Sequence, residues 1–263
     1  MNLGLHGKIA LVGGAGKGLG RAAAFSLARE GVKVGLISRT RATLEKTAAE
    51  IEAATGSEAR AIPADLADRD QAVEAARAAV RLFGRVDILV NNAGGPPSGQ
   101  FLDFADADWD RAFQLNLMSA ISLARELVPG MKARGFGRIV NITSLAVKQP
   151  LDGLILSNAI RAGLHGWAKS LSNELAPFGI TVNNILPGYT LTDRVGSLAA
   201  VLAQKQGTTP EAVIAGWEAG IPMKRLGRPE DLGDLAAFLA SEQAGYITGT
   251  SILIDGGAYK GLM

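Results

Sequence analysis

The sequence contains no cysteine, and its 263 residues include only two histidines, His6 and His165. A disulfide framework, a thiol nucleophile and a cysteine-ligated metal are therefore excluded. Two histidines also argue against a histidine metal site or a serine hydrolase triad, so no metal is predicted. No run of 18 apolar residues occurs, which argues against a membrane-spanning helix and a membrane partner.

The composition is typical of a globular protein. Hydrophobic residues make up 48% of the chain and charged residues 20%, and the length suits a single α/β domain over residues 1–263. The net charge is only +2 and the basic residues are scattered, so no nucleic-acid partner is expected. The N-terminal segment has neither a basic head nor a long apolar stretch, which favours a cytoplasmic protein.

Residues 12–20 contain five glycines between an apolar run, 8–12, and a helix-like run, 21–30. A strand that leads through a glycine-rich turn into a helix places backbone N–H groups at a helix N-terminus, which favours a phosphate. The spacing Gly14-x-x-x-Gly18-x-Gly20 therefore predicts a dinucleotide diphosphate site, where a Cβ would block the turn or the ligand. A flexible glycine linker is the alternative interpretation.

Short apolar runs alternate with segments of helical period along the chain. The short runs predict strands near residues 8–13, 33–38, 59–63, 86–91, 137–143, 180–186 and 251–254. This βαβ rhythm is typical of a doubly wound parallel sheet, here of seven strands, with helices on both faces. Residues 188–223 are the least regular part, and such a long excursion after a strand predicts a substrate lid.

The second predicted strand ends at Ser38 and is followed by Arg39, Thr40 and Arg41. In a dinucleotide fold this position meets the adenosine ribose, where an acidic residue would bind the 2′-hydroxyl of NAD. Arg39, with help from Arg41 and from Lys17 in the glycine loop, can instead bind a 2′-phosphate. The sequence therefore favours NADP(H) over NAD(H), with a solvated basic helix start as the alternative.

Polar and glycine residues also follow the third and fourth predicted strands, as Asp65-Leu66 and as residues 91–95. In an open parallel sheet, ligands bind outside the carboxyl ends of the strands, so these residues are expected to line one crevice. A helix N-cap at Asp65 and an ordinary Asn-Gly turn are the structural alternatives.

These features together resemble the classical short-chain dehydrogenase/reductase family, and most of all its β-ketoacyl-acyl-carrier-protein reductases. The resemblance covers nearly the whole chain and rests on the glycine loop, Asp65, residues 91–94, Asn116, Ser144, Pro187-Gly188 and residues 247–257. It implies a Rossmann fold, and a homotetramer or homodimer built on two long central helices and the last strand.

The resemblance also implies where the cofactor lies, with Asp65 beside the adenine and residues 187–192 near the nicotinamide. Combined with the glycine loop and the end of the second strand, it gives these predicted cofactor-binding residues: Gly14, Gly16, Lys17, Gly18, Leu19, Gly20, Ser38, Arg39, Asp65, Leu66, Asn92, Ala93, Gly94, Arg161, Pro187, Gly188, Thr190 and Thr192.

Members of this family use a catalytic tetrad of Asn, Ser, Tyr and Lys. Asn116 matches the first residue and Ser144 the second, but Ser157 and Arg161 stand where tyrosine and lysine are expected. A serine hydroxyl is a far weaker acid than a phenol, whose reference pKa is about 10. Arg161 can bind ribose hydroxyls but is effectively always protonated and cannot carry the proton.

The missing acid has two nearby candidates in the sequence, Tyr189 and Lys148. Their structural alternatives are an aromatic residue that packs under the lid and a solvated loop lysine. His165 continues the helix face of residues 157 and 161, and the sequence favours a buried structural role for it. The predicted catalytic residues are therefore Asn116, Ser144, Ser157, Arg161 and Tyr189.

The predicted lid contains an apolar helical pattern in residues 198–202 and around Trp217, which hints at a small apolar substrate or at packing within the lid. Arg134 matches a residue that carrier-protein reductases use for docking, whereas the second such position holds Phe178, which makes an acyl-carrier protein a doubtful partner. Two functions stay open: an NADP(H)-dependent oxidoreductase acting on a carbonyl or alcohol with non-standard proton donation, and an NADP-binding pseudoenzyme or regulatory protein.

Overall fold

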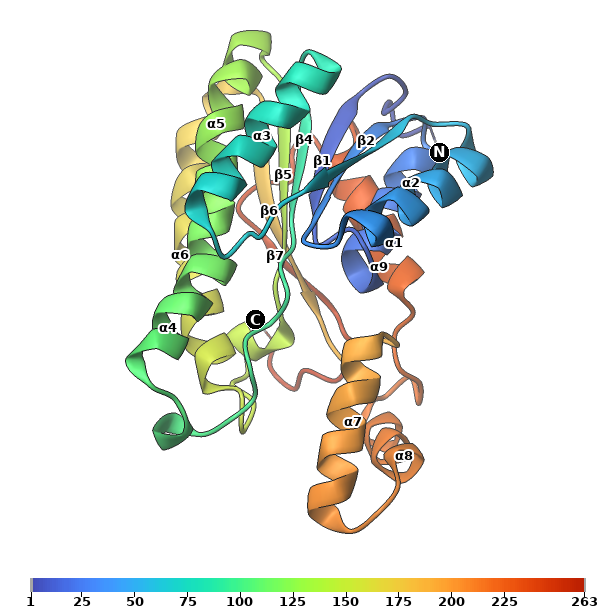
Figure 1. The fold of residues 1–263 in the computed structure, drawn as a ribbon, viewed down its shortest axis with the longest axis vertical. Coiled ribbons are helices and arrows are strands. Elements are labelled where there is room, and N and C mark those ends of the chain that lie inside the picture. Colours follow the sequence, from blue (N-terminus) through green and yellow to red (C-terminus); the bar gives the residue numbers. More distant parts are fainter. Residues whose placement is uncertain (1, 263) are drawn as a thin grey trace.

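A parallel β-sheet forms the centre of the molecule in the computed structural model, which describes residues 2–262 (Figure 1). Within these residues the sheet has seven strands in the order β3-β2-β1-β4-β5-β6-β7. Their bounds are Ile9–Gly13 (β1), Lys33–Ser38 (β2), Ala59–Pro63 (β3), Ile88–Asn91 (β4), Gly137–Ile142 (β5), Ile180–Pro187 (β6) and Ser251–Ile254 (β7). The predicted sheet is confirmed, and each strand lies within two residues of its predicted position.

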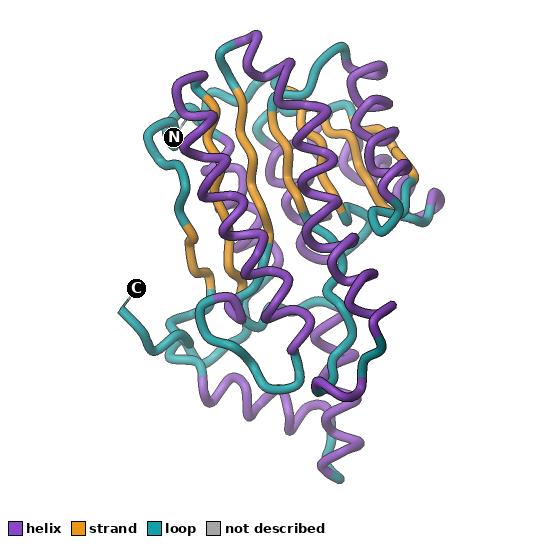
Figure 2. The backbone as a smooth tube through the Cα atoms, turned by 90° about the vertical axis from the view of Figure 1, so that its left-hand side faces the viewer, coloured by secondary structure: helices purple, strands orange, loops and turns teal. Residues whose placement is uncertain are grey.

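Helices cover both faces of this sheet, as Figure 2 shows. One face packs against α1 (Gly18–Arg29), α2 (Arg41–Thr55) and α9 (Pro229–Ala240), and the other against α3 (Arg69–Phe83), α5 (Ser119–Arg134) and α6 (Ile155–Leu175). The short helix α4 (Asp106–Phe113) precedes α5. Two hydrophobic cores result, one on each side of the strands, which is the doubly wound arrangement predicted from the sequence.

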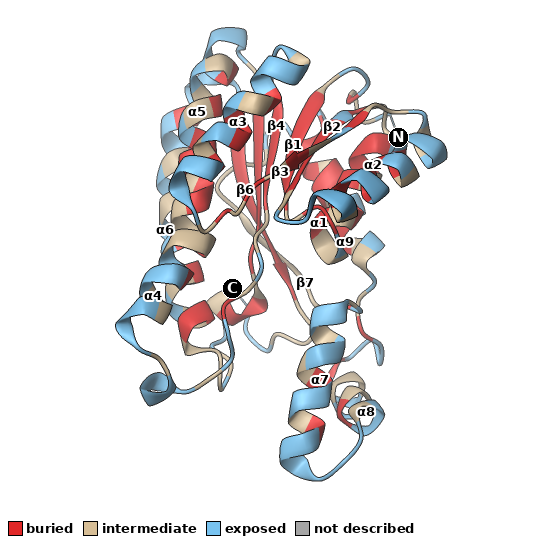
Figure 3. Cartoon of the chain, in the orientation of Figure 1, coloured by how far each residue is buried: buried red, intermediate tan, exposed pale blue. Residues whose placement is uncertain are grey.

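Small residues allow close contact between the layers. Gly233 of α9 lies so near α1 that a Cβ on it would stand 2.6 Å from the carbonyl oxygen of Ala22. All five residues of β1 are buried, as expected for a central strand with helices on both sides (Figure 3). This packing holds the carboxyl end of β1, and with it the glycine loop, in a fixed position.

Two more helices, α7 (Asp193–Gln206) and α8 (Pro210–Gly220), project beyond the carboxyl ends of the strands (Figure 1). They pack on each other through a small cluster centred on Ala199, Ala203 and Val213, with Trp217 at its side. Part of the apolar pattern predicted for a flap over the site is therefore packed within the α7–α8 hairpin itself.

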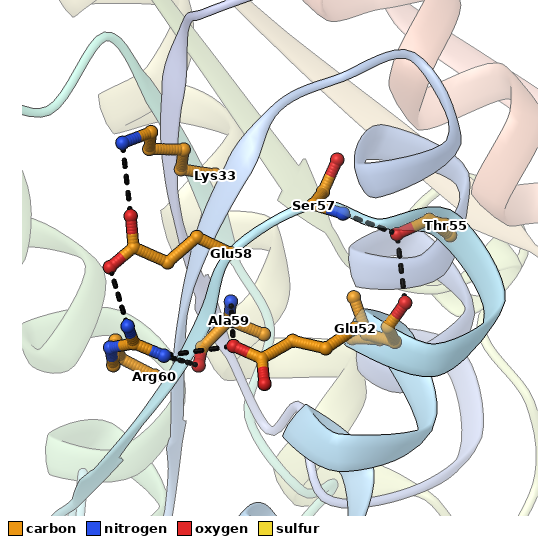
Figure 4. A network of polar contacts seen from close by, with 8 residues as sticks. Lys33, Glu52, Thr55, Ser57, Glu58, Ala59 and Arg60 are labelled. Carbon is orange, nitrogen blue, oxygen red and sulfur yellow. Dashed lines mark hydrogen bonds and ion pairs between the residues drawn. The ribbon is translucent and has the colours of Figure 1, made fainter.

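The opposite, amino ends of β2 and β3 are fixed by ion pairs (Figure 4). Glu58 binds Lys33 at 2.9 Å and Arg60 at 2.8 Å, and Arg60 also binds Glu52 of α2 at 2.8 Å. These contacts fasten the turn between α2 and β3 far from the crevice. No helix within residues 2–262 is long and apolar enough to cross a membrane.

Candidate active site

The sheet order reverses between β1 and β4, which places a crevice at the carboxyl ends of these two strands. The glycine loop lies there and folds against Asn92, whose Nδ2 donates to the carbonyl oxygen of Gly13 at 3.1 Å. Gly14 has a φ of +58°, and a Cβ on it would stand 2.5 Å from Asn92 Nδ2. Only glycine fits this turn, so position 14 of the motif must be glycine for steric reasons.

The first turn of α1 is open to an anion. Its N-cap, Lys17, is extended and makes no side-chain cap, and no acidic residue lies in the first turn. Gly18 has a φ of +58°, and a Cβ on Gly20 would stand 2.5 Å from the carbonyl oxygen of Gly14. The loop therefore leaves N–H groups at a helix N-terminus without a protein acceptor, as a diphosphate requires. Leu19 packs against the core beneath it.

At the end of β2 the structure separates the two candidate arginines. Arg41 lies in the first turn of α2 and pairs with Glu45 at 3.6 Å. Arg39 is exposed and makes no ion pair or hydrogen bond within residues 2–262. Ser38 lies beside the glycine loop, with its Oγ 3.0 Å from where a Cβ on Gly16 would stand. Arg39 is thus the free cation at the predicted ribose position.

Asp65 holds the turn after β3. Its Oδ1 accepts from the backbone N–H of Ala67 at 3.0 Å, and its Oδ2 lies 3.8 Å from Arg111. The side chain therefore has a structural task besides the adenine contact that the resemblance implies. Gly94 has open space where a Cβ would lie, so the loop after β4 leaves room at the crevice.

A cavity of about 20 Å³ brings five of the predicted site residues together: Leu66, Asn92, Ala93, Asn116 and Arg161. Asn91, which the sequence also placed at this crevice, lines it too, as does Ser119, which sequence reasoning did not select. Two atoms in this part of the structure lack hydrogen-bond partners, Asn91 Oδ1 and Arg161 Nε. The cavity has room for about one water-sized group.

Asn116 lies in a π-helical segment, Gln114–Met118, between α4 and α5. Its side chain is buried, and its Nδ2 donates to the carbonyl oxygen of Ala112 at 3.2 Å. Wide turns of this kind often occur at functional sites, because they turn one side chain out of the regular helix register. Ser144 lies at the end of β5 and caps a short 3₁₀ turn, where its Oγ accepts from Ala146 N–H at 3.1 Å.

Ser157 and Arg161 lie one turn apart on α6, and both are buried, at 8% exposure each. The Nη1 atom of Arg161 donates to the carbonyl oxygens of Ile142 and Thr143, just before Ser144. Burial, together with the positive charge of Arg194, lowers the pKa of Arg161 to about 10. The guanidinium is therefore charged at neutral pH and cannot exchange a proton with a substrate.

Tyr189 follows β6 and stacks on Trp217 of α8, with ring centroids 4.4 Å apart and an interplanar angle of 7°. Burial raises the pKa of its phenol, which makes it a poorer proton donor at neutral pH. Pro187 ends β6, and a Cβ on Gly188, the next residue, would stand 2.9 Å from the Cβ of Asp255. Thr192 caps α7 by accepting from Val195 N–H at 3.4 Å.

Comparison with known proteins identifies the family. A family model described as enoyl-(acyl carrier protein) reductase matches residues 14–259. The chain belongs to the short-chain dehydrogenase/reductase family. It is 38% identical to the oxidoreductase UcpA of Escherichia coli (strain K12), over 97% of this chain and 95% of the relative. It is 36% identical to the 3-oxoacyl-[acyl-carrier-protein] reductase FabG of Haemophilus influenzae, over 97% of this chain and 99% of the relative.

The fold of this short-chain dehydrogenase/reductase also matches a solved structure closely. L-Sorbose reductase from Gluconobacter frateurii, solved with NADPH and L-sorbose, superposes with a TM-score of 0.95 at 33% identity, and the match covers all of both chains. The Rossmann-type sheet predicted from the sequence is therefore the family fold.

The first turn of α7 contacts both walls of the crevice, which sequence reasoning missed. Asp193 lies 3.7 Å from Lys17 of the glycine loop. Arg194 donates to the carbonyl oxygens of Gly95 and Pro96, after β4, at 3.0 Å each. No local pattern marks Arg194, because its acceptors lie 98 and 99 positions away in the chain.

His165 has a structural environment, as the sequence favoured. Its Nε2 lies 2.9 Å from Thr143 Oγ1 and its Nδ1 lies 3.0 Å from Ser251 Oγ. Burial, followed by the positive charges of Arg161 and Lys148, lowers its pKa to about 4. The imidazole is therefore neutral at pH 7. Arg134, the predicted docking residue, lies 3.4 Å from the buried carboxylate of Asp87.

Proposed function

We propose that this chain is an NADP(H)-dependent oxidoreductase that reduces a carbonyl group or oxidises an alcohol on a small substrate. The observation that carries the proposal is the glycine cradle at the uncapped N-terminus of α1, next to the unpaired Arg39. The L-sorbose reductase that shares the fold was solved with NADPH, which supports the same cofactor here.

The residues present fit this cofactor. The N–H groups of the glycine loop and of the first turn of α1 would hold the diphosphate, because this helix N-terminus has no side-chain cap and the turn that exposes it admits no Cβ at Gly14 or Gly20. Arg39 would bind the 2′-phosphate, with Lys17 as a second cation at the loop. Pro187 to Thr192 would border the nicotinamide. When bound, NADPH supplies a hydride for a carbonyl carbon.

The catalytic residues act on the carbonyl oxygen. Ser144 would donate a hydrogen bond to this oxygen, and Asn116 would hold a water for proton supply. We infer that Ser157 and Arg161 occupy the tyrosine and lysine positions of the family tetrad, which their places one turn apart on α6 support. Since the Arg161 guanidinium does not exchange protons, the proton must come from water or from a hydroxyl group, Ser157 or Tyr189.

The lid exposes some apolar surface, including Leu191 at 51% and Met223 at 66%. A substrate with an apolar part would be shielded from water by these residues. The internal contacts of Arg134 and the phenylalanine at position 178 argue against docking of an acyl-carrier protein.

A pseudoenzyme that binds NADP without turnover is the second candidate, favoured by Ser157 at the position of the family acid. A screen of NADPH oxidation over ketones, β-keto thioesters and quinones separates the two. We expect at least one carbonyl compound to be reduced by the wild type, and Ser144→Ala to lower this rate by about 10²-fold or more. If the wild type reduces no compound faster than Ser144→Ala does, the oxidoreductase proposal fails and only NADP binding remains.

A further inference from the structure

The α7–α8 hairpin is joined to the rest of the molecule by few contacts. It has a hydrophobic cluster of its own, and within residues 2–262 no other helix or strand packs against it to a comparable extent (Figure 1). Where the chain enters and leaves the hairpin, Leu191 N–H donates to the carbonyl oxygen of Gly227 at 2.8 Å, and Gly227 N–H donates to that of Tyr189 at 2.9 Å. Met223 N–H also donates to the carbonyl oxygen of Gly256 at 3.2 Å. These backbone contacts form a narrow stem, about which the hairpin can turn as a unit.

The first turn of α7 spans the mouth of the crevice between β1 and β4. Asp193 lies 3.7 Å from Lys17, which belongs to the loop after β1. The next residue, Arg194, donates from Nη1 to the carbonyl oxygen of Gly95 and from Nη2 to that of Pro96, in the loop after β4, at 3.0 Å each. Two consecutive side chains thus join opposite walls of the crevice, and we call these two residues the strap.

The two contacts of the strap differ in strength. The side chains of Lys17 and Asp193 are 77% and 79% exposed, and an ion pair between such exposed groups contributes little free energy. Arg194 makes two hydrogen bonds from one charged, planar group, and hydrogen bonds with a charged donor are stronger than neutral ones. The contact of Arg194 with the loop after β4 is therefore the main one that holds the strap in place.

Gly95 provides the space that this contact needs. A Cβ on Gly95 would stand 2.6 Å from Arg194 Nη2 and 2.8 Å from its Cζ. The φ of Gly95 does not lie in the left-handed region, so its backbone could accept an alanine without strain. Glycine at this position is thus required by the guanidinium group and not by the turn. An alanine there would displace the far end of the Arg194 side chain.

We propose that Arg194 and Gly95 form a latch that holds the strap closed over the crevice, and that opening of this latch sets the rate at which NADP(H) enters and leaves. A dinucleotide in such a sheet crosses the crevice outside the carboxyl ends of the strands, so the strap lies across its path. Arg194 is therefore a positioning residue, which acts on the cofactor through the strap. This inference rests on the proposed function, because it concerns the regulation of the same cofactor site.

Stopped-flow fluorescence with NADPH tests the latch through the rate constants of association and dissociation. In Arg194→Ala both rate constants should rise about tenfold, because the strap no longer has to be released before the cofactor passes. The dissociation constant, which is their ratio, should change by less than about threefold. A direct contact between Arg194 and the cofactor predicts another result: only dissociation would become faster, and the affinity would fall by the same factor.

Further variants test whether both residues belong to one latch. Gly95→Ala should raise the two rate constants as Arg194→Ala does, and the double variant should be no faster than Arg194→Ala alone, because both changes break the same contact. Two controls should leave the rate constants unchanged. Lys205→Ala removes an exposed cation from the last turn of α7, and Gly216→Ala adds a Cβ in open space on α8.

A distance measurement gives a readout that does not depend on the cofactor. Because the chain has no cysteine, Leu102→Cys beyond the loop after β4 and Val201→Cys on α7, at positions 89% and 51% exposed, would carry a unique pair of spin labels. In the cofactor-free protein we expect a narrow distance distribution that broadens in Arg194→Ala. An unchanged distribution, or faster dissociation with an equal loss of affinity, would overturn the inference. Failure of the proposed function would differ: the distribution would still broaden, but NADPH would not bind.

Discussion

Arginine at position 161 decides which proton chemistry is open to this site. A lysine ammonium can lower the pKa of a neighbouring phenol, and both can take part in proton transfer. The buried Arg161 contributes charge and hydrogen bonds, but it keeps its proton. Ser157, one turn earlier, is too weak an acid to replace a phenol efficiently. We therefore expect a reacting carbonyl oxygen to take its proton from water.

Restoring the family pair tests this reasoning. We expect Ser157→Tyr combined with Arg161→Lys to raise kcat for ketone reduction by about 10²-fold or more, because a general acid contributes rate of this order. Steady-state kinetics with NADPH would measure it, with Ser157→Tyr alone as the control. A kcat that stays unchanged or falls in the double variant would mean that the native pair is specialised rather than impaired.

His165 gives the fold a pH dependence with a defined sign. Its folded pKa of about 4 lies below the ordinary value of 6.5, so the unfolded chain binds more protons between these values. Stability should therefore fall as the pH is lowered from about 7.5 to 5, by up to about 2 kcal/mol from this group. Urea unfolding at pH 7.5 and pH 5 should show a smaller loss for His165→Asn than for the wild type.

The same prediction can be checked at the residue itself. An NMR titration of the His165 imidazole, whose signals are assigned by comparison with His165→Asn, measures this pKa directly. If the His165 imidazole titrated near the ordinary value of 6.5, the environment described for it would be contradicted.

At the scale of elements, an amide ladder joins the strands that carry the site. Asn91 Nδ2 donates to Asn141 Oδ1 at 2.8 Å, and Asn141 Nδ2 donates to Asn184 Oδ1 at 2.9 Å. Asn184 Nδ2 then donates to Ser251 Oγ at 3.2 Å, which also contacts His165. The strand residues are register partners across β4, β5, β6 and β7. The ladder fixes the strand ends from which Asn92 and Ser144 follow.

Breaking the ladder at its centre should be costly. Asn141 is fully buried, and Asn141→Ala leaves one donor and one acceptor unpaired in addition to a small cavity. We expect a loss of about 2–4 kcal/mol in the free energy of unfolding. Chemical denaturation would measure it, with the exposed Ser170→Ala as the control. A loss below about 1 kcal/mol would show that the ladder contributes little.

The elements differ in how far the sequence could predict them. The strands were predictable because fully buried parallel strands form short apolar runs between turn signals. The glycine loop was predictable because its steric requirement depends only on neighbouring residues. The π-helical turn at Asn116 could not be predicted, since it depends on packing between α4, α5 and α6. The amide ladder required the strand register, and the contacts of Arg194 required the position of α7 over residues nearly a hundred positions earlier. The placement of Arg39 was predictable, but its freedom from ion pairs was not.

At the scale of the whole molecule, the two sheet edges differ. The edge strand β3 carries Arg60 and ends at Pro63, a charge and a proline that discourage pairing with another chain. The other edge, β7, carries Ile252, Leu253 and Ile254, which are only half-buried. A second copy of the chain packed along β7 would cover them, which supports the proposed homodimer or homotetramer.

Sedimentation velocity at micromolar concentration should therefore give a species of two or four chains. Ile252→Lys places a charge on β7 and should shift the distribution towards smaller species, whereas Leu82→Lys on α3, away from β7, should not. A wild-type protein that sediments as a monomer would contradict the proposed assembly.

The central claim is that the crevice between β1 and β4 binds NADP(H) in preference to NAD(H), and fluorescence titration of the protein with NADPH and with NADH tests it most directly. We predict that NADPH binds at least tenfold more tightly, and that Arg39→Ala removes most of this difference by weakening NADPH about ten- to a hundredfold. NADH that binds as tightly as NADPH, or more tightly, would contradict the account.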